Sequence, residues 1–319
     1  MNVRLVVGAI WVFTAPLAIG DFPDKPVRFV VGFTPGGPSD IVARLLGQRL
    51  SEAWSQQVVI DNRAGAGGNI AAELVAKSAG DGYTLLLGNN SILATNAALY
   101  SKLNFDPVKD FAPVILVASQ PNILVVHPSL PVKTVRELIA LAKSKPGQLN
   151  YASSGSGAAA HLSGELFKAM AHVDLVHIPY KGAAPALNDV LAGQDQLMFA
   201  TSLSVMPHIQ SGRLRALAVT TAKRMNALPQ LPTVAEAGVP GFEATTWHGI
   251  VVTSATPPAL VSRINADAAK VLQLPDVRER FAALGAEVIG GTPQEFAVYI
   301  RKEIPKWTKV VKESGAHAD

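Results

Sequence analysis

The chain has 319 residues, which is long enough for two lobes because a single hydrophobic core rarely grows beyond about 250–300 residues. Hydrophobic residues make up 49% of it and charged residues 16%, so the composition indicates a packed globular protein and excludes a disordered one. The net charge of +4, with no cluster of Lys and Arg among aromatic residues, argues against nucleic-acid binding. The absence of cysteine excludes disulfides, a thiol nucleophile and a lipid anchor on cysteine.

Residues 1–20 have the pattern of a secretory signal peptide. Arg4 precedes an uncharged apolar run, and the small residues Ala18 and Gly20 stand before an expected cleavage at Asp21. The apolar run is shorter than the roughly 20 residues that a membrane-spanning helix needs. We therefore expect an exported protein that resides in the periplasm without a lipid anchor.

Strand and helix patterns alternate along the rest of the chain. First we expect a strand at 27–33, a helix capped by Ser39 and Asp40 and ending at Trp54, a strand at 57–61, a helix at 70–78, a strand at 84–88 and a long extended stretch at 114–127. Then come a helix at 135–143, a strand at 150–153, a helix at 158–170, a strand at 175–180, a helix at 185–192, a strand at 197–200, a helix at 205–210, a strand at 214–220 and a second extended stretch at 245–253. The remainder is expected to be helical, with breaks at Pro275 and at Gly290 and Gly291 and a short strand near 286–289.

This order predicts an α/β fold with parallel sheets that are covered by helices on both faces. Two lobes are expected, the second inserted into the first, with the two long extended stretches forming a two-strand hinge beside a central cleft. The expected first lobe covers 21–120 plus 246–319, and the expected second lobe covers 121–245.

Two loops rich in glycine and small residues follow predicted strands and precede predicted helices. They are "FTPGGPSD" at 33–40 and "YASSGSGAAAH" at 151–161. Small residues let the backbone approach a ligand closely, and the free N–H groups at a helix start favour an anion. Helix capping alone would explain one such loop, but two matched loops in opposite lobes favour a site that binds an anionic ligand between them.

Competing cofactor and metal sites are poorly supported. The "GSGAAA" segment at 155–160 fits a dinucleotide-binding pattern, but the next strand ends at 180–181 without the acidic residue that would hold the ribose. His161, His172 and His177 are near one another but lack metal-ligand spacing and acidic neighbours. We therefore expect no cofactor and no metal.

Two alternatives to a transport receptor remain open. The first is an exported α/β serine hydrolase that uses Ser156 or Ser154 as nucleophile with His161 as base, although the elbow pattern G-x-S-x-G would need glycine at position 154. The second is a sensory receptor that signals through a membrane partner. Because neither paired carboxylates nor a nucleophile elbow is visible, we expect a binding protein rather than an enzyme.

Four segments resemble the Bug family, the periplasmic receptors of tripartite tricarboxylate transporters. They are "FPDKPVRFVVGFTPGGPSDIVARLLGQRLSE", "VVIDNRAGAGGNIAAELVAKSAGDGYTLLLG", "YASSGSGAAAHLSGELFK" and "HIPYKGAAPALNDVLAG". The resemblance implies a class II periplasmic-binding-protein fold. It also implies a monomer that captures a small organic carboxylate between its lobes and delivers it to membrane permease subunits.

The resemblance implies ligand contacts through backbone amides and small polar side chains of the facing loops. Asp40 is expected to organise its loop rather than to touch an anion, which it would repel. Lys181 is as well explained by a solvated surface position as by the cleft edge. The implied ligand-binding residues are Phe33, Gly37, Ser39, Asp40, Asn90, Ser91, Asn96, Ser153, Ser154, Gly157, Ala158, His161, Tyr180 and Lys181.

Two further positions bear on the ligand. The resemblance implies an aspartate after the strand at 197–199 in many members, where this chain has Ala200. An acid there would pair with the amino group of an amino acid, so Ala200 favours a plain mono- or dicarboxylate. Trp247 and His248 are expected either to form an aromatic wall of the site or, for Trp247, to pack in the hinge.

Overall fold

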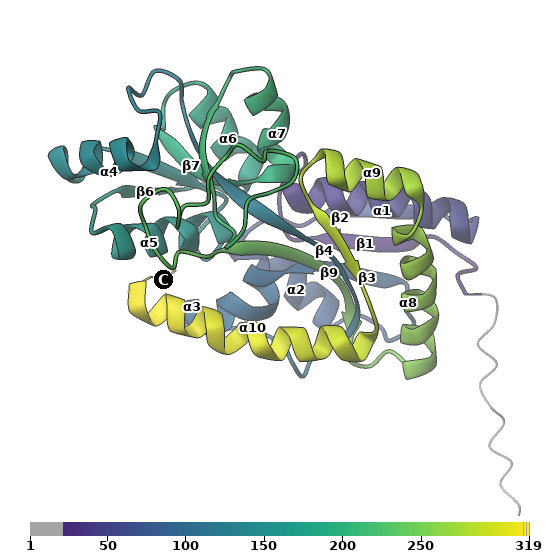
Figure 1. Ribbon diagram of the computed structural model, residues 1–319. Coiled ribbons are helices and arrows are strands. Elements are labelled where there is room, and N and C mark those ends of the chain that lie inside the picture. The colour runs from purple at the N-terminus through teal and green to yellow at the C-terminus, as the bar shows by residue number, and fades with distance from the viewer. Residues whose placement is uncertain (1–21, 315, 317, 319) are drawn as a thin grey trace, which may run out of the picture.

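The computed structural model describes residues 22–314, 316 and 318, and it has two α/β lobes joined by two long strands (Figure 1). The predicted signal peptide at 1–20 lies outside the described residues. Within the described part of the chain, no helix is both long and apolar enough to cross a membrane. The predicted α/β fold with two lobes and a two-strand connection is confirmed.

The first lobe is built on a sheet in which three strands run parallel. β1 (Val27–Val31) lies between β2 (Val58–Asn62) and β3 (Thr84–Asn89), so their carboxyl ends meet at one edge. Four of the five residues of β1 are buried, as expected for a strand covered by helices on both faces. The helical segments that follow these strands are α1 (Pro38–Trp54), η1 (Ala66–Gly68), α2 (Asn69–Ala76), the π-helix η2 (Ser91–Thr95) and α3 (Asn96–Leu99).

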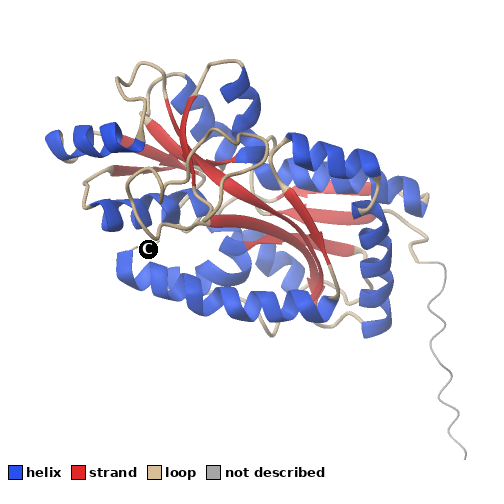
Figure 2. Cartoon of the chain, in the orientation of Figure 1, coloured by secondary structure: helices blue, strands red, loops and turns tan. Residues whose placement is uncertain are grey.

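Two long strands pass between the lobes (Figure 2). β4 (Phe111–Val126) pairs antiparallel with β9 (Thr245–Thr253) up to Pro121. The rest of β4 pairs antiparallel with β7 (Leu197–Thr201) and β8 (Arg215–Val219) of the second lobe. β4 therefore belongs to the sheets of both lobes. The chain returns to the first lobe on β9, which lies beside β4.

The two extended stretches expected from the sequence are confirmed as β4 and β9. The expectation of parallel sheets is wrong for these strands, since β9 runs antiparallel to β3 and β4 runs antiparallel to β7. The reason is that β9 enters the first lobe, and β4 the second, from the other lobe. Each strand therefore enters at the edge where the parallel strands of that lobe end, and runs opposite to them. The lobe boundaries at 120/121 and 245/246 stay a prediction.

The second lobe repeats the strand–helix alternation. β5 (Asn150–Ser153) lies parallel to both β6 (Val176–Pro179) and β7, so the carboxyl ends of these strands also meet at one edge. That edge faces the corresponding edge of the first lobe, and the loops on it carry the small residues seen in the sequence. The helices of this lobe are α4 (Val135–Ser144), α5 (Ala159–Ala171), α6 (Ala183–Leu191) and α7 (Ser202–Gln210).

The C-terminal segment returns to the first lobe and then spans both. α10 (Pro293–Ser314) packs on β4, η2 and α3 of the first lobe and on α5 of the second (Figure 1). Glu303 on this helix accepts hydrogen bonds from the indole nitrogens of Trp247 and Trp307, each at 2.9 Å. Trp247 therefore packs at the crossing strands, which agrees with the expectation that it packs in the hinge. The other elements here are α8 (Pro258–Leu272), α9 (Pro275–Ala283) and β10 (Glu287–Gly290).

The start of α1 corrects one prediction. The N-cap residue is Gly37, and Pro38 occupies the first helical turn, so Ser39 and Asp40 lie inside the helix rather than capping it. Pro38 fits there because the first turn needs no backbone N–H and its φ is already helical. Asp40 instead accepts the backbone N–H of Gly36 at 2.9 Å and the Arg44 guanidinium at 2.8 Å, which organises the loop as expected.

Candidate functional site

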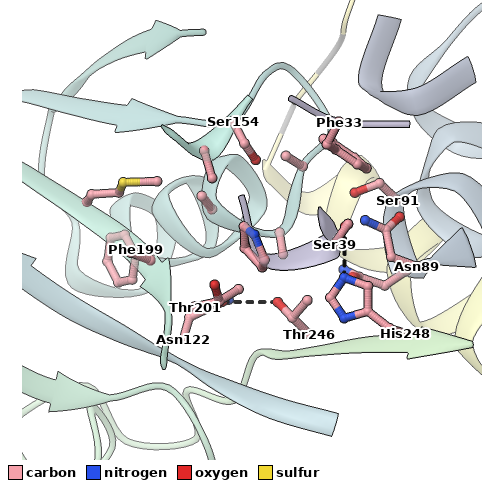
Figure 3. A pocket seen from close by; sticks show the side chains of 18 residues that line it. Phe33, Ser39, Asn89, Ser91, Asn122, Ser154, Phe199, Thr201, Thr246 and His248 are labelled. Carbon is pink, nitrogen blue, oxygen red and sulfur yellow. Dashed lines mark hydrogen bonds between the residues drawn. The ribbon is translucent and has the colours of Figure 1, made fainter. Parts of the chain in front are cut away.

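A cavity lies between the two lobes, at the strand ends where several helices begin (Figure 3). Its volume is about 40 Å³, measured as the space open to the centres of water molecules. The cavity is therefore small, and residues of both lobes line it. The cavity is lined by Phe33, Pro38, Ser39, Asn89, Asn90, Ser91, Asn122, Ser154, Ala158, Ala159, Ala160, Ala183, Met198, Phe199, Ala200, Thr201, Thr246 and His248.

Five helical segments direct their N-terminal ends at this cavity. The lining includes Pro38 at the start of α1, Ser91 at the start of η2, Ala159 at the start of α5, Ala183 at the start of α6 and Thr201, the N-cap of α7. The first N–H groups of a helix have no partner within it, and the helix dipole is positive at this end. The arrangement therefore favours a negatively charged ligand without any cationic side chain.

The side chains that line the cavity are neutral. Within the described residues, the lining contains no Asp, Glu, Lys or Arg. Asn90 is fully buried, and neither its amide nitrogen nor its amide oxygen has a hydrogen-bond partner in the described chain. A buried polar group without a partner costs about 1–3 kcal/mol, so such a group in a cavity wall is suited to bind a ligand.

Hydrogen bonds hold the other polar lining residues in place. Asn122 on β4 accepts the hydroxyl of Thr246 on β9 at 3.0 Å and donates to Ser163 on α5 at 3.2 Å. Ser39 and His248 contact each other at 2.9 Å between Oγ and Nε2 (Figure 3). The hydrogen bonds of Asn122 connect β4 and β9 to α5 of the second lobe. The contact between Ser39 and His248 connects the glycine-rich loop at 33–40 to β9.

Burial determines the charge of His248. The side chain is 1% exposed, and this burial lowers its pKa from 6.5 to about 3. The imidazole is therefore neutral at physiological pH. It contributes hydrogen bonds to the cavity wall, but no charge.

The low pKa of His248 predicts a loss of stability in acid. An unfolded histidine titrates near pH 6.5, so below this pH the unfolded chain binds a proton that the folded chain refuses. The contribution is full above the unfolded pKa, and the free energy of unfolding should fall by about 1.4 kcal/mol per pH unit as the pH drops below about 6.5. Urea unfolding at a series of pH values measures this slope. His248→Gln should remove the contribution of this histidine to the slope of unfolding free energy against pH. An equal slope in the variant would contradict the prediction.

Comparison with known proteins identifies the family. A family model described as the tripartite tricarboxylate transporter family receptor matches residues 42–316. The chain belongs to this family. BugT of Bordetella pertussis is 38% identical over 323 residues, covering 99% of each protein. The resemblance to the Bug family is thereby confirmed.

Two solved structures of similar proteins contain organic acids. R. palustris Rpa4515 with adipate is 44% identical, with a TM-score of 0.91, and the match covers 93% of this chain and 99% of that one. MatC from Rhodopseudomonas palustris with bound malate is 34% identical, with a TM-score of 0.87, covering 91% and 100%. These proteins share the two-lobed fold of this receptor.

Some of the predicted ligand-binding residues of this receptor meet at the cavity. Both glycine-rich loops contribute, and so does the segment after β3. They lie on opposite sides of the cavity although they are far apart in the sequence. The predicted residues that line it are Phe33, Ser39, Asn90, Ser91, Ser154 and Ala158.

Other predicted residues lie behind the cavity wall. Gly37 stands directly before Pro38, which lines the cavity. A Cβ atom placed on Gly37 would lie 3.7 Å from the Cβ of Ala183 in the other lobe. Asp40 binds its own loop, and its pKa is lowered because hydrogen bonds from Arg44 and Gly36 outweigh the opposing effect of burial. Both residues shape the first loop without lining the cavity.

Asn96 and Gly157 make a contact between the lobes beside the cavity. The amide of Asn96 donates to the backbone oxygen of Gly67 at 3.1 Å and to Asn69 at 2.6 Å. A Cβ atom on Gly157, whose φ is +79°, would lie 3.0 Å from the Asn96 amide oxygen. These two predicted residues therefore take part in lobe contact and are absent from the lining.

The remaining predicted residues of the second lobe also lie outside the lining. The Ser153 hydroxyl contacts His177 Nε2 at 2.6 Å, and His161 Nδ1 accepts the backbone N–H of Gly157 at 3.0 Å. Tyr180 donates its hydroxyl to Asp189, which takes its side chain away from the cavity.

Lys181 also lies outside the lining and is exposed. This position agrees with the solvated lysine that was one of its two interpretations.

Several lining residues were not predicted. Asn122 and Thr246 lie on the crossing strands, where each is a buried polar residue close to other polar residues, so the sequence carries no signal that marks them as cavity lining. His248 had been considered only for an aromatic wall. Ala200 lines the cavity at the position from which the class of ligand was argued. The others are Pro38, Asn89, Ala159, Ala160, Ala183, Met198, Phe199 and Thr201.

The geometry gives no support to a serine hydrolase. Ser154 lines the cavity, whereas the Nδ1 atom of His161 already accepts a backbone N–H. Ser153 contacts His177, and Ser39 contacts His248 in the cavity itself. Burial, together with the nearby His161, lowers the pKa of His177 to about 3, and burial lowers the pKa of His248 to about 3. A general base works best with a pKa near the operating pH, so both histidines are poor bases.

Proposed function

We propose that this receptor captures a small organic carboxylate in the cavity between its lobes and delivers it to the permease subunits of a tripartite tricarboxylate transporter. The observation that carries the proposal is the buried, unpartnered amide of Asn90 in a neutral cavity where five helical segments begin. An amide nitrogen and free backbone N–H groups donate to a carboxylate, and the absence of lysine and arginine lets the anion leave again.

The proposed ligand carries no amino group. Ala200 lines the cavity at the position where an aspartate could hold an ammonium, and the described lining contains no other acid. A buried ammonium without an anionic partner is costly, so an amino acid should bind poorly. The two similar proteins with adipate and malate support this class of ligand, because neither acid has an amino group.

We also propose how capture works. The lobes, 21–120 plus 246–319 and 121–245, rotate about β4 and β9, and a bound acid holds them closed because the two sides of the cavity belong to different lobes. The receptor acts as a monomer in the periplasm, from which the predicted signal peptide at 1–20 has been removed. Closure presents a joint surface of both lobes to the permease.

A thermal-shift screen tests the proposed function. The protein is unfolded and refolded to remove retained ligand, and its melting temperature is measured with citrate, succinate, malate, adipate, nicotinate, terephthalate, aspartate and glutamate. A ligand that binds only the folded state raises this temperature. We expect a shift with one or two acids that lack an amino group and none with their neutral amides. Equal shifts with the amides, or silence across the panel, would overturn the proposal.

Ser154→Ala is expected to weaken binding of the best acid of the panel. Ser154 lines the cavity from the second lobe (Figure 3), and losing its hydroxyl should cost about 1–2 kcal/mol of binding free energy, or roughly 5- to 30-fold in Kd. Isothermal titration measures the change. Ser156→Ala alters a neighbouring serine that does not line the cavity and should leave Kd unchanged. Equal effects of the two substitutions would remove Ser154 from the site.

A further inference from the structure

Three hydrogen-bonded side chains form a line that leads from outside the cavity into its wall. Gln120 on β4 is buried and does not line the cavity. Its amide nitrogen Nε2 lies 3.0 Å from Nδ1 of His248, and Nε2 of the same ring lies 2.9 Å from Oγ of Ser39. Ser39 lines the cavity in the first turn of α1. These three side chains therefore connect β4 to the surface that lines the cavity.

The chemistry of these groups assigns the ring proton. An amide nitrogen only donates hydrogen bonds, so Nδ1 of His248 must accept one from Gln120. A neutral imidazole carries a single proton, which then lies on Nε2 and is donated to the oxygen of Ser39. The hydroxyl hydrogen of Ser39 is consequently not used by His248 and is available to the cavity.

The opposite orientation of the Gln120 amide would reverse this assignment. It would place the amide oxygen at Nδ1, move the ring proton there and make Ser39 donate to Nε2. In the observed orientation the amide oxygen is buried and accepts no hydrogen bond from the described residues. The structure has the amide nitrogen at Nδ1, and the position of the ring proton distinguishes the two orientations.

We propose that Gln120 is a positioning residue that makes the Ser39 hydroxyl a hydrogen-bond donor toward the bound acid and thereby favours a carboxylate over its neutral amide. The proposal rests on the proposed function, because it assigns the contact through which the receptor distinguishes a carboxylate from its neutral amide. A hydroxyl locked as a donor matches either oxygen of a carboxylate. It would oppose the NH₂ group of a carboxamide, which is itself a donor.

Nitrogen NMR of the histidine side chains tests the proton assignment without any ligand. With His248→Gln used to identify the signals, we expect His248 to show an unprotonated Nδ1 and a protonated Nε2. Gln120→Met removes the donor and should increase the share of ring protonated at Nδ1. A wild-type protein with its proton on Nδ1 would overturn the proposal, whatever acid the receptor binds.

A double-mutant cycle tests the effect on binding, with adipate as the probe and adipamide as its neutral counterpart. We expect Gln120→Met to weaken adipate binding about 3- to 10-fold and to reduce the preference for adipate over adipamide. In a Ser39→Ala background the same substitution should have no further effect, because the hydroxyl that it acts through is gone. A purely structural role of Gln120 would give additive losses and would overturn the proposal. If wild type does not bind adipate, the proposed function fails for this acid while the NMR result still decides the proton assignment.

Discussion

Gly182→Ala is expected to weaken carboxylate binding by about 1–3 kcal/mol, or roughly 5- to 150-fold in Kd, while both lobes still fold. Gly182 stands directly before α6 in the second lobe, at a φ of +152°. A Cβ atom there would lie 2.9 Å from the Cβ and Cγ2 atoms of Thr34 in the first lobe, with the Thr34 hydroxyl oxygen closer still. The methyl group therefore obstructs the contact that closes the lobes over the ligand. Isothermal titration with the best acid of the panel measures the effect.

Two variants separate this obstruction from backbone strain. Gly212 also has a positive φ, of +72°, but a Cβ atom there would have nothing within 4 Å, so Gly212→Ala should cost stability and leave Kd unchanged. Thr34→Gly removes the three atoms that the new methyl group would meet and should restore binding to Gly182→Ala. Unchanged affinity in Gly182→Ala, or no restoration by Thr34→Gly, would show that this contact does not govern capture.

Asn90→Leu is expected to reduce binding about 10- to 150-fold and yet to raise the stability of the ligand-free protein. A hydrogen bond to a charged group contributes about 1.5–3 kcal/mol, and the substitution removes it. The same side chain is buried without a partner, so replacing its amide by an apolar group of similar shape should increase the free energy of unfolding by about 1 kcal/mol. Titration measures the first effect, and urea unfolding without ligand measures the second.

Asn122→Leu is the matched control for stability. Asn122 is equally buried, but its amide is paired with Thr246 and Ser163. Its replacement should lower the free energy of unfolding, since it leaves the partners of the amide unpaired. If Asn90→Leu destabilises the protein as much as Asn122→Leu, the Asn90 amide has a structural role and the account of the site is wrong.

Much of the fold could be predicted because its signals are local. The strand at 150–153 was predicted at its observed bounds, and most other elements within a few residues, since apolar spacing and flanking glycines mark them. The segment at 89–100 carried no such signal and forms the π-helix η2 followed by α3. Strand direction was missed at β4 and β9 because a run of buried apolar residues does not show which neighbour it will pair with.

The site could be predicted only in its loops. Ser154 and Ala158, which line the cavity, were predicted because glycine and small residues at a helix start suggest a ligand. Asn122 and Thr246 were missed because their hydrogen bond joins residues 124 positions apart and exists only once β4 and β9 lie side by side. Conversely, Tyr180 and Lys181 were predicted at the edge of the cleft. The Tyr180 hydroxyl donates to Asp189 instead, and Lys181 is exposed and absent from the lining, which a motif cannot reveal.

A crystal structure of the refolded receptor with the best acid of the panel tests the central claim most directly. The account predicts a carboxylate group in the cavity, within hydrogen-bond distance of the Asn90 amide and of groups from both glycine-rich loops, and with no lysine or arginine side chain in contact. An acid bound elsewhere, held by a cationic side chain, or seated in the cavity with Asn90 still unpartnered would contradict it.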